Sequence, residues 1–179
     1  MEIRLGRTKI ALDFGFPALL AVILLCSDRT LLLETAAVCI LHECGHGAAM
    51  LLSRAGLGEI RFTAAGLQLR AGSSILPVWV QELIYLAGPA ANLLCAALLW
   101  HIRVEFAALH LCMGLFNLLP YGCLDGGAAL RQLFPDGSRQ QKYLCTALSA
   151  ALAVVMVRFA VRNPLLYLML LYLTVREWL

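Results

Sequence analysis

The sequence has few charged residues: 14% of its 179 residues are Asp, Glu, Lys or Arg, against about 25% in a soluble domain. Hydrophobic residues make up 61% of the chain, and the mean hydropathy is +0.82. This scarcity of charge leaves almost no room for a soluble domain and indicates a polytopic membrane protein. The net charge of +3 gives no support to nucleic-acid binding, because the distribution of basic residues described below accounts for it.

Paired cysteine motifs and a cleavable leader are also missing. The seven cysteines show no C-x-x-C spacing, which favours small buried side chains over disulfides. The basic N-terminal residues are separated from the first apolar run by Asp13, and no small-x-small cleavage site follows Cys26. Neither an internal repeat nor a low-complexity tract is present.

Apolar runs predict an all-α polytopic membrane protein with about six transmembrane helices. The predicted spans cover residues 14–26, 31–53, 77–100, 106–134 with a break inside, 142–159 and 164–179. Six spans place both termini on one side of the membrane. Ten of the 14 Lys and Arg residues then lie on that side, so the positive-inside rule predicts that both termini are cytoplasmic.

Two short segments have a different pattern. Residues 1–13 alternate partly between polar and apolar side chains, which suits a short strand at the membrane surface. Residues 61–70 have a partial period of two with an arginine at each end, which predicts a strand or hairpin. Such a strand can line a cleft and pair with an extended peptide. A plain surface loop is the alternative.

The second predicted span contains the sequence Leu-His-Glu-Cys-Gly-His-Gly at residues 41–47. His42 and His46 are four residues apart, so they share one helix face and can bind one Zn²⁺, while Glu43 can take a proton from a metal-bound water. The alternative is a chance pattern within a packed core. An ionised group near the membrane midplane costs roughly 2 kcal/mol or more, which favours a functional role. Cys44 points away from the histidine face, which argues against a thiolate ligand.

A catalytic zinc usually has a third protein ligand, and Asp125 is the best candidate. It lies in a segment, 117–127, that interrupts an otherwise helical span with Asn117, Pro120 and three glycines. Gly126 and Gly127 are expected to let the backbone bend so that the carboxylate reaches the metal. Asp125 could instead cap the following helix, and the two roles are compatible. Helical rise from the cytoplasmic edge places Asp125 about 14 Å deep and the histidines about 10 to 16 Å deep.

Three other polar residues lie in the predicted spans. Asn92 follows Gly88 and Pro89, which permit close packing and interrupt a helix hydrogen bond. Asn92 and Asn117 are candidates either to bind the oxyanion or substrate backbone, or to bridge helices. The structural role is favoured for Asn92 and the functional one for Asn117. His110, two turns before Asn117, is interpreted as a core histidine in preference to a ligand.

This pattern predicts hydrolysis of a peptide bond with one Zn²⁺ per chain. The metal lowers the pKa of its water towards about 7 and polarises the scissile carbonyl. Glu43 takes the proton and later gives it to the leaving amine. The ligand set of His, His and carboxylate suits zinc, and it also admits Fe²⁺ or Co²⁺.

With HExxH in one span, Gly-Pro-x-x-Asn in the next and Asn-x-x-Pro-x-x-x-x-Asp-Gly in the third, the chain resembles the site-2 protease family of intramembrane zinc metalloproteases. The matching core covers residues 31–134. The resemblance implies that His42, His46 and Asp125 bind zinc, that Glu43 is the acid/base, and that a membrane protein is cut at or within the bilayer. The layout of one span before the core and two after it resembles the stage IV sporulation FB type, whose members release a pro-sigma factor.

The chain departs from that subgroup because no CBS domain follows the last span, and the PDZ domain of other branches is also absent. We therefore expect one membrane-embedded domain, 1–179, whose partners are the bilayer, a membrane protein substrate and membrane regulatory proteins. Two other functions remain open. One is a non-catalytic protein of the same fold that binds a partner helix. The other is a metal-dependent membrane enzyme that acts on a lipid or prenyl substrate.

Overall fold

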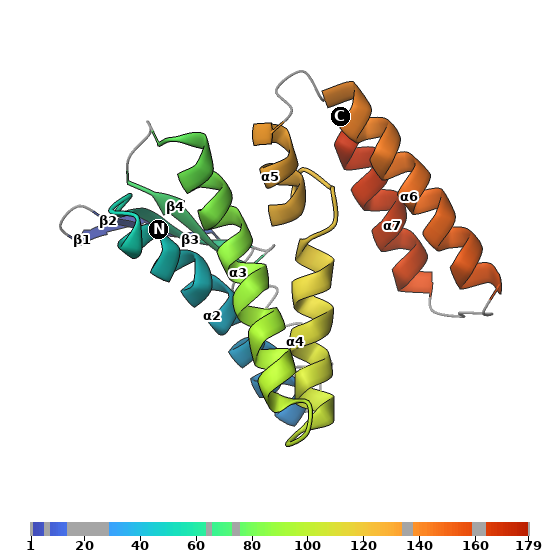
Figure 1. Cartoon of the computed structure of the whole chain (residues 1–179), viewed down its shortest axis with the longest axis horizontal. Helices are drawn as coiled ribbons and strands as arrows, with labels where there is room; N and C mark the ends of the chain where they lie inside the picture. The colour runs from blue at the N-terminus through green and yellow to red at the C-terminus, as the bar shows by residue number, and fades with distance from the viewer. Residues whose placement is uncertain are drawn as a thin grey trace. The chain divides into compact units, whose positions relative to one another are not determined.

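The computed structural model describes residues 2–5, 8–13, 29–63, 66–72, 76–133, 138–158 and 164–178. The chain divides into two compact units, Met1–Phe116 and Asn117–Leu179 (Figure 1). Each unit is described by itself below. The first predicted span, 14–26, lies outside the described residues.

The helices follow the predicted spans closely. Their bounds are α2 (Arg29–Leu52), α3 (Val78–Leu99), α4 (Val104–Asn117), α5 (Asp125–Leu133), α6 (Ser138–Arg158) and α7 (Pro164–Trp178). The broken fourth span is confirmed as two helices, α4 and α5. Within the described part of the chain, three segments are long and apolar enough to cross a membrane: Arg29–Leu52, Val78–Leu99 and Arg139–Arg158. The structure therefore supports a largely helical membrane protein, and the count of six spans stays a prediction.

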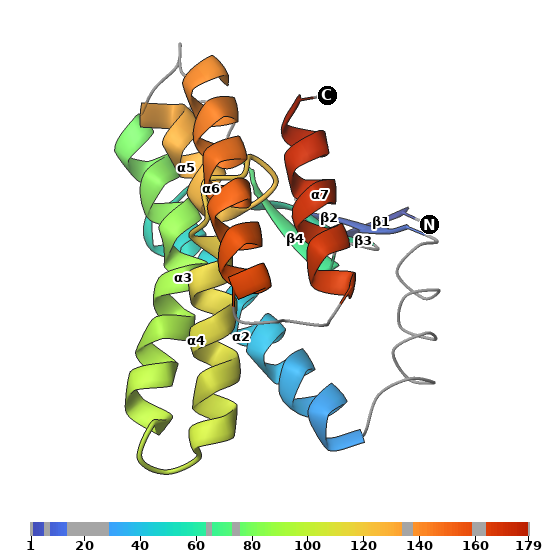
Figure 2. The same ribbon diagram turned by 90° about the vertical axis from the view of Figure 1, so that its right-hand side faces the viewer.

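Four strands form one sheet in the first unit, in the order β1 (Glu2–Leu5), β2 (Thr8–Leu12), β3 (Leu57–Thr63), β4 (Gly66–Ala71). The β1–β2 and β3–β4 pairs are antiparallel, and β2 runs parallel to β3 (Figure 2). The predicted hairpin is confirmed as β3–β4, which excludes a plain loop there. The leader, for which the sequence predicted one short strand, forms two strands, and these extend the hairpin into a four-stranded sheet.

Glu59 is the main charged residue of the sheet. Its carboxylate accepts hydrogen bonds from Arg61 at 2.9 Å and Arg70 at 3.5 Å, and Lys9 lies 3.9 Å away. The hydrogen bond from Arg61 holds the pKa of Glu59 below its ordinary value, with the charges of Arg61, Arg70 and Lys9 adding to the effect. Arg61 lies on β3 with Glu59, whereas Lys9 of β2 and Arg70 of β4 lie directly opposite Glu59. These two cross-strand pairs favour the observed register, because opposite charges face each other across adjacent strands.

Helices α2 and α3 pack through small residues. A Cβ atom added to Gly45 of α2 would lie 2.6 Å from the Ala87 carbonyl oxygen and 2.9 Å from the Ala91 Cβ of α3. This close approach is the kind of contact that associates helices in a bilayer. The opposite face of α2 carries exposed apolar side chains such as Leu33 and Ile40, which suits contact with lipid.

The buried residues of α2 repeat at helical spacing and form one face: Val38, His42, His46, Ala49 and Met50. The C-terminal end of this face belongs to an apolar cluster with Val80 and Ile84 of α3, against which Leu57 and Leu69 of the sheet also pack. Sheet and helices of the first unit therefore share one core. The two histidines on the same face are the exception to its apolar character.

The second unit contains α5, α6 and α7. Helices α6 and α7 pack against each other and run antiparallel (Figure 1). Thr174 of α7 donates a hydrogen bond to Ser149 of α6 at 2.7 Å, and the fully buried Tyr121 hydrogen-bonds to the same Ser149. The segment before α5 is thereby packed onto the α6–α7 pair.

Candidate metal centre

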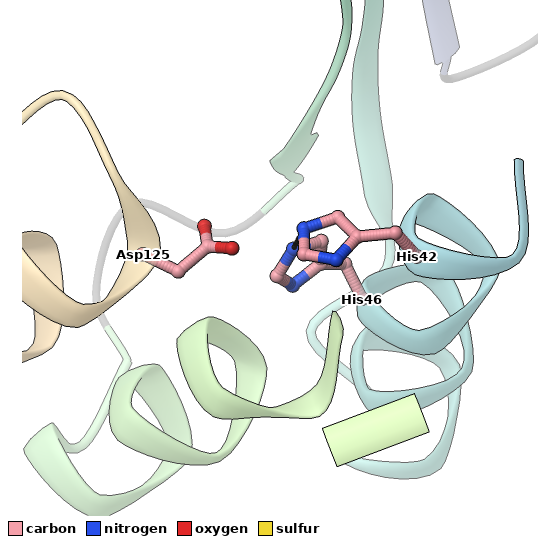
Figure 3. Close-up of side chains that lie close together, drawn as sticks. All are labelled: His42, His46 and Asp125. Atoms are coloured by element: carbon pink, nitrogen blue, oxygen red, sulfur yellow. Dashed lines mark hydrogen bonds between the residues drawn. The ribbon is translucent and has the colours of Figure 1, made fainter. Parts of the chain in front are cut away.

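His42 and His46 lie on the buried face of α2 with their rings close together (Figure 3). Their Nε2 atoms are 3.1 Å apart, and the rings are nearly perpendicular, with an interplanar angle of 83°. The side chains are 3% and 7% exposed respectively. The predicted pairing on one helix face is therefore present in the structure, inside a helix long and apolar enough to cross a membrane.

The ring of His46 is oriented by the backbone of α3. Its Nδ1 lies 2.7 Å from the carbonyl oxygen of Ile84. A carbonyl can only accept, so Nδ1 carries the proton and Nε2 keeps its lone pair. Gly88 makes room for the ring, because a Cβ at this position would lie 2.3 Å from His46 Nε2. The glycine of the Gly-Pro-x-x-Asn motif is thus required by the position of the imidazole.

The ring of His42 is oriented by Asn92, the last residue of the same motif. Asn92 is fully buried, and its Nδ2 lies 3.3 Å from Nδ1 of His42. Its Oδ1 lies 3.2 Å from Nδ1 of His110 on α4. Within the first unit, the amide of Asn92 on α3 bridges α2 and α4. The choice between a structural role and a substrate-binding role for Asn92 stays a prediction.

The donor chemistry of this pair fits a zinc ion. Two imidazole nitrogens bound to one tetrahedral zinc at about 2.0 to 2.1 Å would be roughly 3.3 Å apart. The observed Nε2 to Nε2 distance is 3.1 Å. The other ring nitrogen of each histidine hydrogen-bonds to a protein group, as is usual for metal-binding histidines. Within the first unit, the Nε2 atoms of His42 and His46 are therefore placed to share one metal ion.

Asp125 is the first residue of α5, in the second unit. The glycines that follow it are packed against the preceding loop: a Cβ on Gly126 would lie 2.2 Å from the Leu118 carbonyl oxygen, and one on Gly127 2.0 Å from that of Tyr121. Neither has a positive φ, unlike Gly56. The absence of a Cβ at both positions lets the helix N-terminus lie against its own loop backbone. The expectation that these glycines bring the carboxylate to a metal stays a prediction.

The loop before Asp125 is held by side chains from α6 and α7. Gln141 donates to the carbonyl oxygens of Pro120 at 2.7 Å and Gly127 at 3.3 Å. Glu177 accepts from the backbone N–H of Gly122 at 2.8 Å and from the guanidinium of Arg131 at 2.9 Å. These contacts satisfy polar backbone groups that an irregular segment leaves open.

Sequence reasoning did not find Gln141, Arg131 or Glu177. A signal was available for Glu177, which is the only acidic residue between positions 164 and 179. Its side chain is 4% exposed, so it is a buried carboxylate in an otherwise apolar helix. Such a residue requires a partner, and the partners are the Gly122 amide and Arg131.

The remaining predicted residues take different positions. Glu43 is half-buried on α2, between the two histidines in sequence. Cys44 is exposed on the same helix. Asn117 is the last residue of α4, and its substrate or oxyanion role stays a prediction.

One solved structure has the same fold along nearly the whole chain, a site-2 protease from Methanocaldococcus jannaschii. The TM-score is 0.67, the sequence identity is 20%, and the match covers 99% of this chain and 94% of that one. No protein-family model and no curated protein matches the sequence. The similarity establishes the fold, and the chemistry rests on the residues described above.

Proposed function

We propose that this protein is an intramembrane zinc metalloprotease that hydrolyses peptide bonds of membrane proteins within or near the bilayer. One observation carries the proposal. A pair of buried histidines, with Nε2 atoms 3.1 Å apart, lies on a helix long and apolar enough to cross a membrane. Polar residues at that depth are costly and mark functional sites. The fold shared with a site-2 protease supports the same reaction.

Asp125 is the third ligand in this proposal. His42 and His46 would supply two imidazole nitrogens from α2 of the first unit, and Asp125 would supply a carboxylate oxygen from α5 of the second. Two imidazoles and one carboxylate leave a fourth position of a tetrahedral ion for water or substrate, as in other zinc hydrolases. One zinc per chain is expected. The N-terminal turn of α5 also favours a negative charge at Asp125, so a contribution to helix stability is compatible with this role.

The other roles in hydrolysis are assigned to residues of the chain itself. When bound, Zn²⁺ would supply a Lewis acid that polarises the scissile carbonyl and lowers the pKa of a water. Glu43, which adjoins His42 in sequence, takes the proton from that water and delivers it to the leaving amine. Asn117 donates a hydrogen bond to the oxyanion or the substrate backbone. Asn92 is a support of His42 through the contact described above.

The proposed substrate is a membrane-associated or transmembrane protein in extended conformation. β4 is an edge strand of the sheet, and an edge strand can pair with an added peptide. The finer parts of the proposal rest on sequence: six transmembrane spans in a single membrane-embedded domain with cytoplasmic termini, and a layout like that of sporulation-type site-2 proteases. That layout supports a membrane-bound precursor of a sigma factor as the substrate and membrane proteins as regulators.

The first experiment is cleavage of a panel of single-pass substrates by detergent-purified protein, wild type beside Glu43→Gln. The substitution keeps size and hydrogen bonding and removes the base, so we expect hydrolysis to fall by about 10²-fold or more. Glu105→Gln is the matched control, because Glu105 is an exposed acid in the first turn of α4. Equal cleavage by wild type and Glu43→Gln would contradict the assigned mechanism.

Metal content separates the alternatives. A non-catalytic protein that binds a partner helix would not retain one zinc per chain, and it would cleave no member of the panel. A lipid or prenyl enzyme would retain the metal and turn over such a substrate with peptide bonds left intact. Zinc at one per chain, lost in the His46→Ala variant and retained in Cys44→Ala, is the result that the proposal predicts.

A further inference from the structure

His110 of α4 was interpreted from the sequence as a core histidine, and its surroundings give it a more specific place. The side chain is 2% exposed. Its ring packs against the ring of Phe106 in a T-shaped arrangement, with ring centroids 4.8 Å apart. Its Nδ1 lies 3.2 Å from Oδ1 of Asn92. An apolar side chain would fill the same space without burying a polar ring, so packing alone does not account for an imidazole here.

A continuous line of polar groups runs through the first unit and ends at His110. The Ile84 carbonyl contacts His46 at 2.7 Å, and His46 contacts His42 at 3.1 Å. His42 contacts Asn92 at 3.3 Å, and Asn92 contacts His110 at 3.2 Å. The line crosses three helices, α2, α3 and α4, and each member is buried.

The positions of the protons along this line depend on one another. Nδ1 of His46 must donate to the Ile84 carbonyl, so its Nε2 is an acceptor. In the structure the amide nitrogen of Asn92 faces Nδ1 of His42. Binding of a metal through Nε2 of His42 requires the proton on Nδ1 of that ring, so the amide would then turn over and present its oxygen. The amide nitrogen of Asn92 is left to donate to His110. Nδ1 of a neutral imidazole can either donate or accept, so His110 matches both orientations of the amide.

We propose that His110 is a positioning residue for the metal centre, which acts through Asn92 to hold the ring orientation of His42. This inference rests on the proposed function, since it assigns His110 to the support of a proposed metal ligand. His110 is assigned neither as a metal ligand nor as a substrate contact. Its contribution is to complete the hydrogen bonding of the buried amide that contacts His42.

The test compares three single variants by metal affinity, measured by competition with a chromogenic chelator on the purified full chain. His110→Leu removes the hydrogen bond and should weaken zinc binding about 10-fold, at the lower end of the effect of an outer-shell partner. His110→Asn places an amide where Nδ1 was, able to donate or accept, and should restore affinity to within about twofold of wild type. Phe106→Leu alters the packing of the same ring and should leave the affinity unchanged.

A fourth variant tests whether His110 acts on His42 through Asn92. In an Asn92→Leu background, His110→Leu should cause no further loss, because the link to His42 is already cut. Cobalt substitution gives a spectroscopic check, since the visible bands of Co²⁺ should shift in His110→Leu and not in Phe106→Leu.

Two results would overturn the inference alone: wild-type affinity in His110→Leu, or equal losses in His110→Leu, His110→Asn and Phe106→Leu, which would indicate packing. Failure of the wild-type protein to bind metal at all would contradict the proposed function itself, and this inference with it. The two kinds of failure are therefore distinguished by the wild-type measurement.

Discussion

In the first unit, two metal-binding candidates stand on one helix, and neutral groups orient both rings: the Ile84 carbonyl for His46 and the Asn92 amide for His42. In the second unit, Asp125 follows an irregular loop. Side chains that include a buried carboxylate, Glu177, and its partner Arg131 hold this loop. The backbone of a helix is already held by its own hydrogen bonds. Only the orientation of the two imidazole rings then has to be set, and neutral hydrogen-bond partners are enough for that. A loop leaves its own amides and carbonyls open, and these must be satisfied from elsewhere.

The comparison teaches that the surroundings of the histidines in the first unit depend on shape, and that the loop before Asp125 in the second unit depends on charge and hydrogen bonds. Around His46, the space is limited by Gly88. Around Asp125, the loop depends on hydrogen bonds from side chains far along the chain, such as Gln141 and Glu177. Substitutions that change volume should therefore matter most in the first unit, and substitutions that remove a polar partner should matter most in the second.

The largest expected effect is that of Gly88→Ala. The added methyl would lie 2.3 Å from His46 Nε2, so the ring must leave its place. We expect zinc affinity to fall about 100-fold or more, beyond the usual loss of a second-shell partner. Gly47→Ala is the control, because its Cβ would meet Leu69 at an ordinary 3.6 Å. Chelator competition on both variants measures the effect, and unchanged affinity in Gly88→Ala would show that shape is not limiting there.

The next largest effect tests the charged residues that hold the loop before Asp125. Glu177→Ala leaves the Gly122 amide and the Arg131 guanidinium without their carboxylate, and we expect a loss of about 2 kcal/mol in stability. The same loosening should lower affinity for zinc through Asp125. Arg176→Ala, on the exposed side of the same helix, is the control. Denaturant unfolding and hydrogen exchange of Gly122 measure the loss.

Glu177→Gln sharpens this result. The amide oxygen can still accept from Gly122, while the charge opposite Arg131 is gone. If Glu177→Gln lowers the free energy of unfolding about as much as Glu177→Ala does, the effect is due to the charge. A cost close to zero would assign it to the hydrogen bond alone and would weaken the contrast between the two units.

A smaller effect is expected for Tyr121→Phe in the second unit. The Tyr121 hydroxyl hydrogen-bonds to Ser149, which keeps partners in Thr174 and the Cys145 carbonyl when the hydroxyl is removed. The expected cost is about 1 kcal/mol, the worth of one neutral hydrogen bond. Tyr143→Phe, at an exposed ring, is the control. If Tyr121→Phe lowered the stability more than Glu177→Ala does, charged contacts would not be the stronger stabilising interactions in this unit.

The smallest effect concerns Glu59 in the sheet. Its hydrogen bond from Arg61 lowers its pKa in the folded protein, so the ion pairs contribute stability at pH values above the ordinary carboxylate range. This contribution is lost as the pH falls through the folded-state pKa. Glu59→Gln should therefore lower the thermal midpoint at pH 7, and the difference from wild type should shrink as the pH falls below the ordinary carboxylate range. A difference in thermal midpoint between wild type and Glu59→Gln that persists at acid pH would show that the ion pairs of Glu59 are not its cause.

Several parts of the fold and site follow from short-range patterns in the sequence. The four-residue spacing of His42 and His46 predicts their shared face, and apolar runs predict the helices from α2 onward. The period of two predicts β3 and β4. These succeed because each depends on residues within one or two turns of each other.

The rest depends on contacts between distant residues. The parallel pairing of β2 with β3 joins positions such as Ile10 and Ile60, and no local pattern specifies it. Asn92 and His110 are each ordinary in their own helices, and the line they form exists only when three helices pack together. Glu177 and Gly122 are 55 positions apart. The sequence identifies these residues as polar in apolar surroundings and does not name their partners.

The hydrogen bond between Gly122 and Glu177 also sets an order in time. Glu177 is synthesised 55 residues after Gly122, which at about 5 to 20 residues per second is a delay of roughly 3 to 11 s. During that interval α2 and its histidines are already made, and the loop before Asp125 has not yet gained its carboxylate partner. A nascent chain therefore carries its two imidazoles before the loop that precedes Asp125 is secured, so the proposed site can be completed only after α7 has been translated.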